Sequence, residues 1–260
     1  MNIEITDSHC AEIFTILFQH IRLFTDQISI GFSTTGMYLQ TMDSARVSII
    51  EITLPNTWFQ KYECTEDVVL GINATILFKI LNAREKSQRI NIVYESESTD
   101  ALYLHFLSED KTIFDKHFQC PLMDIESETM TIPPIEYAAE ITIPSAVFST
   151  LIQQLKTFGD SLDITCNETK IELAAKSPDS GTMAVEVNID DLSSFAINEG
   201  EELRMSFSLN QLHHICMFNK LAKEMTIGLC DQYPMSVFYN ITDDGAKLSA
   251  YLAPKIGVDD

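Results

Sequence analysis

The chain has 260 residues, of which 45% are hydrophobic and 21% charged, a composition that is typical of globular proteins and excludes extensive disorder. Its 17 basic and 38 acidic residues give a net charge of −21, so a surface of evenly mixed charge would repel nucleic acid and anionic lipid. No apolar run reaches the roughly 18 residues of a transmembrane helix, and the acidic N-terminus lacks the apolar stretch of a signal peptide. We therefore expect no membrane partner and a reducing compartment.

Four segments carry apolar residues at the spacing of an amphipathic helix. They span residues 9–22, 73–84, 145–157 and 209–220. Residues of the types that cap helix N-termini stand at their starts, and the expected caps are Ser8, Asn73, Ser145 and Ser208. Between the helices, apolar and polar residues alternate as in half-buried strands, most clearly at 28–32, 102–106, 183–189, 203–207 and 225–229.

The second half of the chain repeats the first. Phe14 and Leu17 match Phe148 and Leu151 at a separation of 134 positions, and near residue 77 the match continues at a separation of 135. Each half contains a strand, a helix and three strands, twice over. The sequence therefore predicts an α+β fold of two similar domains, built from four such units that begin near residues 3, 66, 138 and 203.

The stretch 120–136 separates the two halves. It contains Pro121, Pro133 and Pro134 together with several acidic residues, and proline disfavours both helices and central strands. We expect an extended interdomain connector here, an N-terminal domain over 1–119 and a C-terminal domain over 137–260.

Charge is distributed unevenly between the predicted helices and the rest of the chain. The four helices contain a single acidic residue, Glu12, and five basic ones, for a net charge of +4. Glutamate is a good helix former, so helix propensity does not explain its scarcity. We interpret the exposed helix faces as a surface that meets DNA phosphates without binding them tightly.

Three motifs stand out along the chain: GMYLQTMDSARVSII at 36–50, LGINATILFKIL at 70–81 and AYLAPKI at 250–256. In combination they resemble the eukaryotic sliding clamps of the proliferating cell nuclear antigen (PCNA) family, and the resemblance runs the full chain. It implies a ring of three subunits in which helices line the central hole and sheets form the outside. The four-unit pattern and the acid-poor helices, obtained from the residues alone, agree with this arrangement.

The resemblance implies a DNA-facing set of residues on the helices. Several basic positions of the family hold uncharged residues here, so the inner charge is thinner than in the relatives. The set is Arg22, Lys79, Asn82, Arg84, Gln153, Lys156, Asn210, His213 and Lys220.

The resemblance also implies an apolar pocket beneath the connector, into which replication proteins insert a short helical turn with two aromatic side chains. Subunits are expected to pair through strand edges at 112–118 of one copy and 181–187 of the next. Val47 and Ile49 are equally well explained as core residues. The pocket maps to Met42, Arg46, Val47, Ile49, Met130, Ile132, Pro133, Tyr137, Tyr233, Pro234, Tyr251, Leu252, Ala253 and Pro254.

The sequence predicts a homotrimeric processivity clamp that encircles double-stranded DNA without sequence preference. Its expected partners are DNA polymerase and other replication and repair proteins with a PCNA-interacting peptide, and an ATP-dependent clamp loader. Two alternatives share the fold: one subunit of a heterotrimeric checkpoint clamp, and a DNA-independent adaptor that keeps only the partner pocket. We expect a nuclear location for a cellular eukaryotic protein and the site of viral DNA replication for a virus-encoded one.

No pattern predicts an enzyme. The stretch 31–36 lacks the spacing of a nucleophile elbow and is typical of a hairpin turn between two strands. The adjacent His213 and His214 point in different directions on a helix, and the six dispersed cysteines lack metal-ligand spacing. We expect no catalytic residues, no cofactor and no metal.

Overall fold

The computed structural model describes residues 1–95, 100–125, 129–231 and 233–255. The chain forms two compact units. The first comprises Met1–Ser44, Ile50–Met130 and Ile241–Leu248, and the second comprises Ala45–Ile49, Thr131–Asn240 and Ser249–Asp260.

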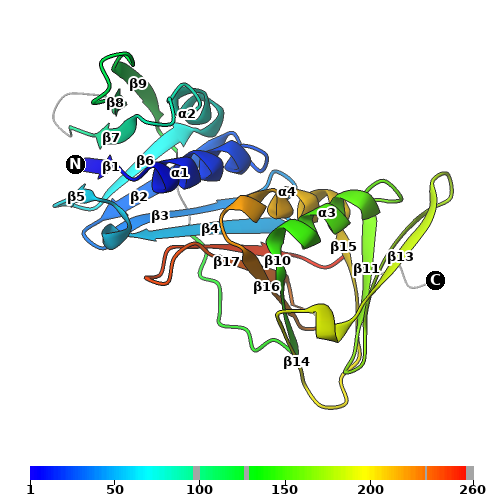
Figure 1. The fold of residues 1–260 in the computed structure, drawn as a ribbon. Coiled ribbons are helices and arrows are strands. Elements are labelled where there is room, and N and C mark those ends of the chain that lie inside the picture. The colour runs from blue at the N-terminus through cyan, green and yellow to red at the C-terminus, as the bar shows by residue number, and fades with distance from the viewer. Residues whose placement is uncertain (96–99, 126–128, 232, 256–260) are drawn as a thin grey trace. The chain divides into compact units, whose positions relative to one another are not determined.

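Each unit contains two copies of the predicted motif, a strand followed by a helix and three strands. In the first unit these are β1–α1–β2–β3–β4 and β6–α2–β7–β8–β9, with the short strand β5 between them (Figure 1). The predicted α+β fold is confirmed. The bounds are β1 Asn2–Ile5, α1 Ser8–Ile21, β2 Gln27–Ser33, β3 Gly36–Met42, β4 Ser48–Pro55, β5 Lys61–Glu63, β6 Val68–Asn73, α2 Ala74–Leu81, β7 Arg89–Val93, β8 Ala101–Leu107 and β9 Lys116–Met123.

The second unit repeats the motif as β10–α3–β11–β12–β13 and β15–α4–β16–β17–β18, with the short strand β14 inserted. A 3₁₀ turn, Met217–Lys220, follows α4 directly, and another, Ile189–Asp191, precedes β14. The bounds are β10 Ala139–Pro144, α3 Ser145–Leu155, β11 Ser161–Cys166, β12 Ile171–Ser177, β13 Gly181–Val187, β14 Ser194–Ile197, β15 Leu203–Ser208, α4 Leu209–Cys216, β16 Glu224–Leu229, β17 Met235–Asn240 and β18 Lys247–Leu252.

The sheet of the first unit is antiparallel, and its strands follow the order β4-β3-β2-β6-β9-β8-β7-β1-β5. Strands β2 and β3 form the hairpin expected at 31–36, because Ser33 pairs with Gly36 across a two-residue loop. Gly36 has φ 146°, and a Cβ atom there would lie 2.3 Å from the carbonyl oxygen of Leu54. Only glycine fits this position.

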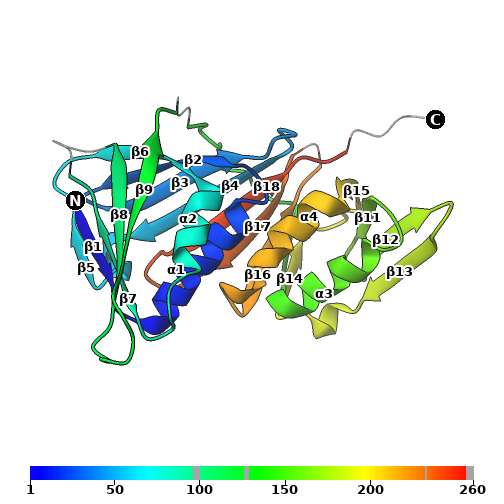
Figure 2. The same ribbon diagram turned by 90° about the horizontal axis from the view of Figure 1, so that it is seen from above.

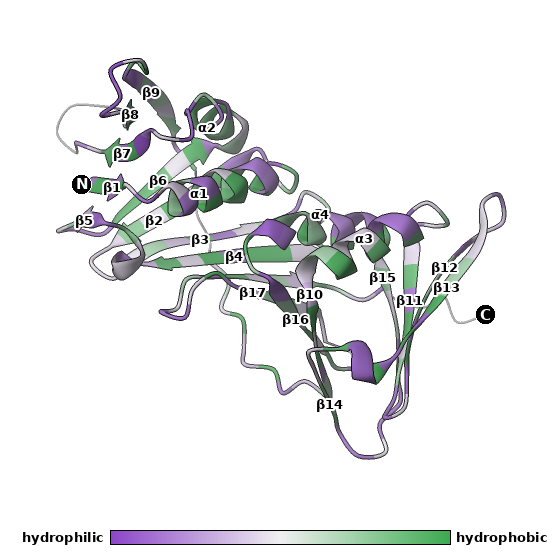
Figure 3. Cartoon of the chain, in the orientation of Figure 1, coloured by the Kyte–Doolittle hydropathy of each residue, from purple (hydrophilic) through white to green (hydrophobic). Residues whose placement is uncertain are grey.

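The two helices of the first unit pack side by side against its sheet (Figure 2). Leu17 and Phe18 of α1 are fully buried together with Ile28 and Ile30 of β2 and Leu39 of β3. Hydrophobic and hydrophilic residues lie on different faces of the helices (Figure 3). The apolar spacing in the sequence therefore marks the face that is removed from water, as in any amphipathic helix.

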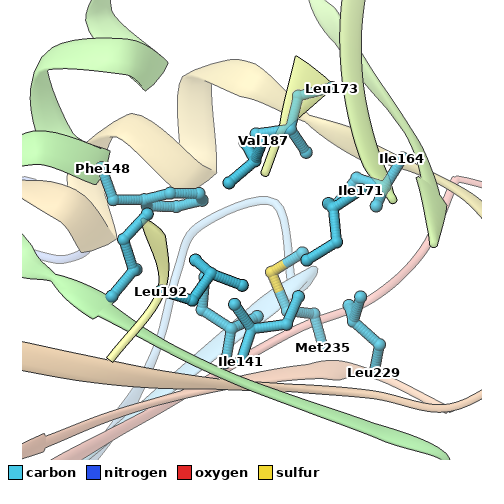
Figure 4. Close-up of a pocket in the computed structure, with 11 residues that line it drawn as sticks. Ile141, Phe148, Ile164, Ile171, Leu173, Val187, Leu192, Leu229 and Met235 are labelled. Carbon is cyan, nitrogen blue, oxygen red and sulfur yellow. The ribbon is translucent and has the colours of Figure 1, made fainter. Parts of the chain in front are cut away.

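In the second unit, helices α3 and α4 pack together against two groups of strands, β14-β10-β16-β17-β18 and β13-β12-β11-β15. A cavity of about 20 Å³ remains in the core, between β10, β16, β17, the second group and α3. Only apolar side chains line it, including Phe148 and Met235 (Figure 4). A void of this size without polar partners does not hold a stable water molecule, so it is a packing defect and not a ligand site.

Two of the four expected helix caps are wrong. Asn73 and Ser208 accept from the backbone N–H groups of Ile76 and Gln211, as predicted. Helix α1, however, is capped by Asp7, and Ser8 is its first helical residue. Helix α3 begins at Ser145 directly after Pro144 and has no side-chain cap, because the proline at the N-cap position carries no side-chain oxygen that could accept a hydrogen bond.

The Asp7 cap gives a stability prediction. Asp7 Oδ1 accepts from the Cys10 N–H at 2.8 Å, so Asp7→Ala should lower the free energy of unfolding by about 1 kcal/mol. The same hydrogen bond lowers the pKa of Asp7, and the stabilisation should therefore be present at neutral pH and disappear as the pH falls through the folded-state pKa. Urea denaturation measures both effects. Asp7→Asn, which keeps a side-chain oxygen that can cap the helix, is the matched control, and an equal loss there would contradict the cap.

The expected connector begins inside a strand. Its first four residues, Cys120–Met123, complete β9, where Pro121 pairs with Ala101 of β8. Residues 129–137 form no helix or strand. No helix among the described residues is long and apolar enough to cross a membrane.

Candidate functional site

Most of the expected DNA-facing residues lie at or near the C-terminal ends of the helices, whereas Asn210 lies at the start of α4. Arg22, Asn82 and Lys156 are the C-cap residues of α1, α2 and α3, and Lys220 ends the 3₁₀ turn after α4. Positive charge at a helix C-terminus interacts favourably with the helix dipole, so the basic members stabilise the helices as well as offering charge to a ligand. The exposed members of the set are Arg22, Lys79, Asn82, Gln153, Asn210 and Lys220.

Arg84 is already engaged by the protein. Its guanidinium Nη1 donates to three backbone carbonyls of the loop after α2, at 3.0–3.1 Å, and the side chain is half-buried. Arg22 lies over the ring of Phe78, with 4.6 Å between the guanidinium carbon and the ring centroid. The guanidinium of Arg22 is exposed on the surface of the helix pair, whereas that of Arg84 holds the loop after α2 together.

His213 adds little positive charge at neutral pH. Burial lowers the pKa of its imidazole, and the nearby charge of Lys156 lowers it further. A histidine with a lowered pKa is mostly neutral at pH 7. The positive charge on the helices therefore comes from arginine and lysine.

In the second unit, expected pocket residues gather around a row of aromatic rings. Phe238 contacts both Tyr137 and Tyr251, with ring centroids 6.5 and 6.2 Å apart and interplanar angles of 73° and 85°. These edge-to-face contacts are favourable arrangements for aromatic pairs. All three side chains are half-buried, so each ring also leaves part of its surface accessible.

The C-terminal segment of the second unit lies beside Val47. The Ala253 N–H donates to the Val47 carbonyl at 2.8 Å, and the Lys255 N–H donates to the Ser206 carbonyl at 2.7 Å. Two stretches of the expected pocket, 46–49 and 251–254, are thus brought together. Arg46 is exposed and has φ 58°, a conformation that costs a residue other than glycine roughly 1–2 kcal/mol.

Accessibility differs among the expected pocket residues. Leu252 is fully buried in β18, so its side chain belongs to the core, and alternation along the strand leaves Tyr251 and Ala253 on the accessible side. Val47 and Ile49 are half-buried. In the second unit, Pro133 and Tyr233 are exposed, and Ile132 and Pro234 are half-buried; in the first unit, Met42 is half-buried and Met130 is exposed.

Sequence reasoning missed one residue of the aromatic row, Phe238, and one residue that packs against it, Gly228. Phe238 stands between Val237 and Tyr239, which are both buried, and the alternation of β17 would have placed Phe238 on the opposite face. Gly228 lies beneath Tyr137, and a Cβ atom there would lie 2.6 Å from Tyr137 Cγ. This close approach could not be predicted from spacing, because it depends on the packing of residues far apart in the chain.

Strands β9 and β13 each have an edge without a partner strand in the described part of the chain. Strand β13 ends its sheet and pairs only with β12. Strand β9 pairs with β8 through Lys116–Pro121, whereas β6 pairs only with Leu122 and Met123 of β9. Exposed edges of this kind carry unpaired backbone N–H and C=O groups that can pair with another chain. The β13 edge has the bounds of the expected stretch 181–187, whereas the β9 edge overlaps the expected stretch 112–118 only at Lys116–Phe118.

Apolar surface accompanies both edges. In the second unit, a groove of about 680 Å³ lies between α3 and β13, lined mainly by apolar side chains such as Val147, Leu151 and Val185. Val147 is 58% exposed. In the first unit, Phe114 lies two residues before β9 and is 83% exposed, more than any other large apolar side chain in the described residues. Exposed apolar surface of this extent is typical of protein interfaces.

The cysteines do not form a reactive centre. All six are free thiols, and burial raises the pKa of Cys120 and Cys166 to about 11, so both stay protonated at neutral pH. Among the described residues, no group of three or more His, Cys, Asp and Glu side chains is placed to hold a metal ion.

The repeated units, in which a helix pair with little acidic charge covers antiparallel strands, define a two-domain sliding clamp. Residues 6–129 match the N-terminal domain of proliferating cell nuclear antigen, and residues 131–256 match its C-terminal domain. The chain is also 30% identical over 230 residues to the proliferating cell nuclear antigen of Chaetomium thermophilum, which covers 87% of this chain and 88% of the relative. The chain belongs to the proliferating cell nuclear antigen family of DNA sliding clamps, which act in DNA replication as processivity factors.

Proposed function

We propose that this protein is a homotrimeric clamp that encircles duplex DNA and tethers DNA polymerase. The observation that carries the trimer is the pair of unpaired strand edges, β9 in one unit and β13 in the other. If β9 of one copy pairs with β13 of the next, every copy uses one edge of each kind. Such a head-to-tail interface can close into a ring in which the β9 and β13 edges are both paired.

Apolar surface supports the same pairing. The groove between α3 and β13 would receive the apolar side chain of Phe114, which precedes β9 of the next copy. Burying such a side chain contributes about 1.5–3 kcal/mol. Light scattering on the unaltered protein should therefore give about three times the chain mass of 29.4 kDa. A monomer would contradict the ring and favour a DNA-independent adaptor, and assembly only with other chains would favour a checkpoint clamp.

The helices supply the proposed surface toward DNA. Their basic residues lie at the helix ends, and the exposed positions between them are mostly uncharged polar residues such as Thr150, Gln153 and Asn210. A surface without base-reading side chains and with few cations would let duplex DNA slide without sequence preference. We propose that an ATP-dependent loader closes the ring on DNA, in the nucleus of a eukaryotic cell or at a site of viral replication.

Partner proteins are proposed to bind beside the aromatic row with a short peptide of the pattern Q-x-x-[aliphatic]-x-x-[aromatic]-[aromatic]. Ile132→Glu should place a charge in the apolar site and weaken peptide binding by about 2–4 kcal/mol, a roughly 30- to 1,000-fold rise in Kd. Calorimetry measures this change. Thr131 is exposed and adjacent, so Thr131→Glu is the matched control and should leave Kd within about threefold. Equal Kd values for the Ile132→Glu and unaltered proteins would place the peptide elsewhere.

A further inference from the structure

The side chain of Gln40 holds the segment that leads into the expected pocket. Gln40 lies on β3, and its carboxamide makes two hydrogen bonds to the backbone of Met130, which is 90 positions later in the chain. Oε1 accepts from the Met130 N–H at 2.6 Å, and Nε2 donates to the Met130 carbonyl at 2.8 Å. The carboxamide thus takes the place of a neighbouring strand for one residue.

A second pair of contacts orients the carboxamide. Nε2 of Gln40 also donates to Glu51 Oε1 at 3.0 Å, and the same oxygen accepts from the Tyr38 hydroxyl at 2.7 Å. Because Glu51 can only accept, it fixes the amino side of the carboxamide next to itself and leaves Oε1 for the Met130 N–H. Hydrogen bonds to a charged acceptor are stronger than neutral ones, so Glu51 favours this orientation of the Gln40 carboxamide over the flipped one.

The residue that Gln40 holds lies in a stretch without regular structure. Residues 129–137 form neither helix nor strand, and they carry three expected pocket residues close behind Met130, of which Ile132 is the nearest. A chain segment that must be ordered when a ligand binds lowers the affinity, because its conformational freedom is lost at that moment. A segment that is already fixed avoids this loss.

We propose that Gln40 is a positioning residue for partner binding: its carboxamide fixes Met130 and so preorganises the start of the connector for the peptide, without contacting the peptide itself. The inference rests on the proposed partner-binding function. It assigns to Gln40 a role separate from the core packing of β3, because the side chain of Gln40 is directed at the backbone of a distant segment and not at the core of the sheet.

The experiment compares peptide affinity and local amide exchange in the full-length protein. Gln40→Ala removes both hydrogen bonds to Met130 and should raise the peptide Kd about tenfold, mainly through faster dissociation. Gln40→Glu keeps an acceptor but loses the donor and places a carboxylate beside Glu51, so its Kd should rise further. Adding Glu51→Gln should relieve this repulsion and recover part of the loss. Gln27 is exposed at the start of β2, and Gln27→Ala is the matched control.

Hydrogen exchange distinguishes positioning from general destabilisation. In Gln40→Ala the Met130 amide should exchange faster, while the amides of β2 and β3 keep their protection. A Kd that stays within about twofold of the unaltered protein overturns the inference, and so does a loss of protection that spreads through β2 and β3. If the unaltered protein binds no such peptide, the proposed partner function falls together with this inference.

Discussion

Phe114→Asp and Val147→Glu should each reduce the mass in solution from about three chains to one. The two residues lie on the two complementary surfaces of the proposed ring, Phe114 beside the β9 edge and Val147 in the groove beside the β13 edge. A charge buried in an apolar interface without a partner costs several kcal/mol, of order 2–4. The cost recurs at every interface of the ring, so a single substitution prevents closure.

Mixing the two variants gives a sharper result. Each variant keeps one intact surface, so one Phe114→Asp chain and one Val147→Glu chain can form a single sound interface and should assemble as a dimer. Val69 on β6 is 62% exposed and lies on neither edge, and Val69→Asp should remain a trimer. Light scattering at micromolar concentration measures the mass of the two single variants, of their mixture and of Val69→Asp. Trimers in both single variants would refute the proposed interface.

The clamp should remain on circular DNA at salt concentrations that abolish its binding to open-ended DNA. Five basic residues per chain lie in the helices or just beyond their C-terminal ends, and one of them, Arg84, is occupied by backbone carbonyls. With few direct phosphate contacts, affinity for linear DNA should be weak and should fall steeply with salt. A closed ring on a circle has no end to leave from, so about 1 M salt, where the screening length is roughly 3 Å, should not release it.

Cutting the circle provides the decisive step. Linearisation should release the loaded protein, and blocking the ends should retain it. Replacement of the exposed lysines Lys79 and Lys220 by Glu should impair loading while leaving the trimer mass and peptide Kd unchanged, since these positions lie on the helix pairs. Protein that persists on unblocked linear DNA in high salt would disprove retention by topology and indicate a true binding site.

Much of the architecture could be predicted from local pattern. The spacing of apolar residues located all four helices to within three or four residues at their ends, and the repeated order of strand, helix and three strands was confirmed in both halves. Both depend on which residues leave water, and this is set by neighbours close in the chain. The scarcity of acidic residues on the helices could likewise be predicted, because it follows from the composition of these segments.

The structure differed from the sequence-based predictions at residues whose role depends on distant partners or on the position of a single atom. Asp7 and not Ser8 caps α1, because the cap is decided by which side-chain oxygen reaches the Cys10 N–H. Leu252 belongs to the core and Arg84 to a loop, although both stand among residues expected to meet ligands.

Sequence by itself determined the α+β class, the internal duplication and the uneven distribution of charge, since each depends only on residue types and on their spacing along the chain. Only the tertiary structure decided that β9 and β13 expose unpaired edges, that Phe238 joins Tyr137 and Tyr251, and that Gln40 binds the backbone of Met130. Strand pairing and side-chain contacts between residues far apart in the chain are set by packing and hydrogen-bond geometry, which no local period encodes.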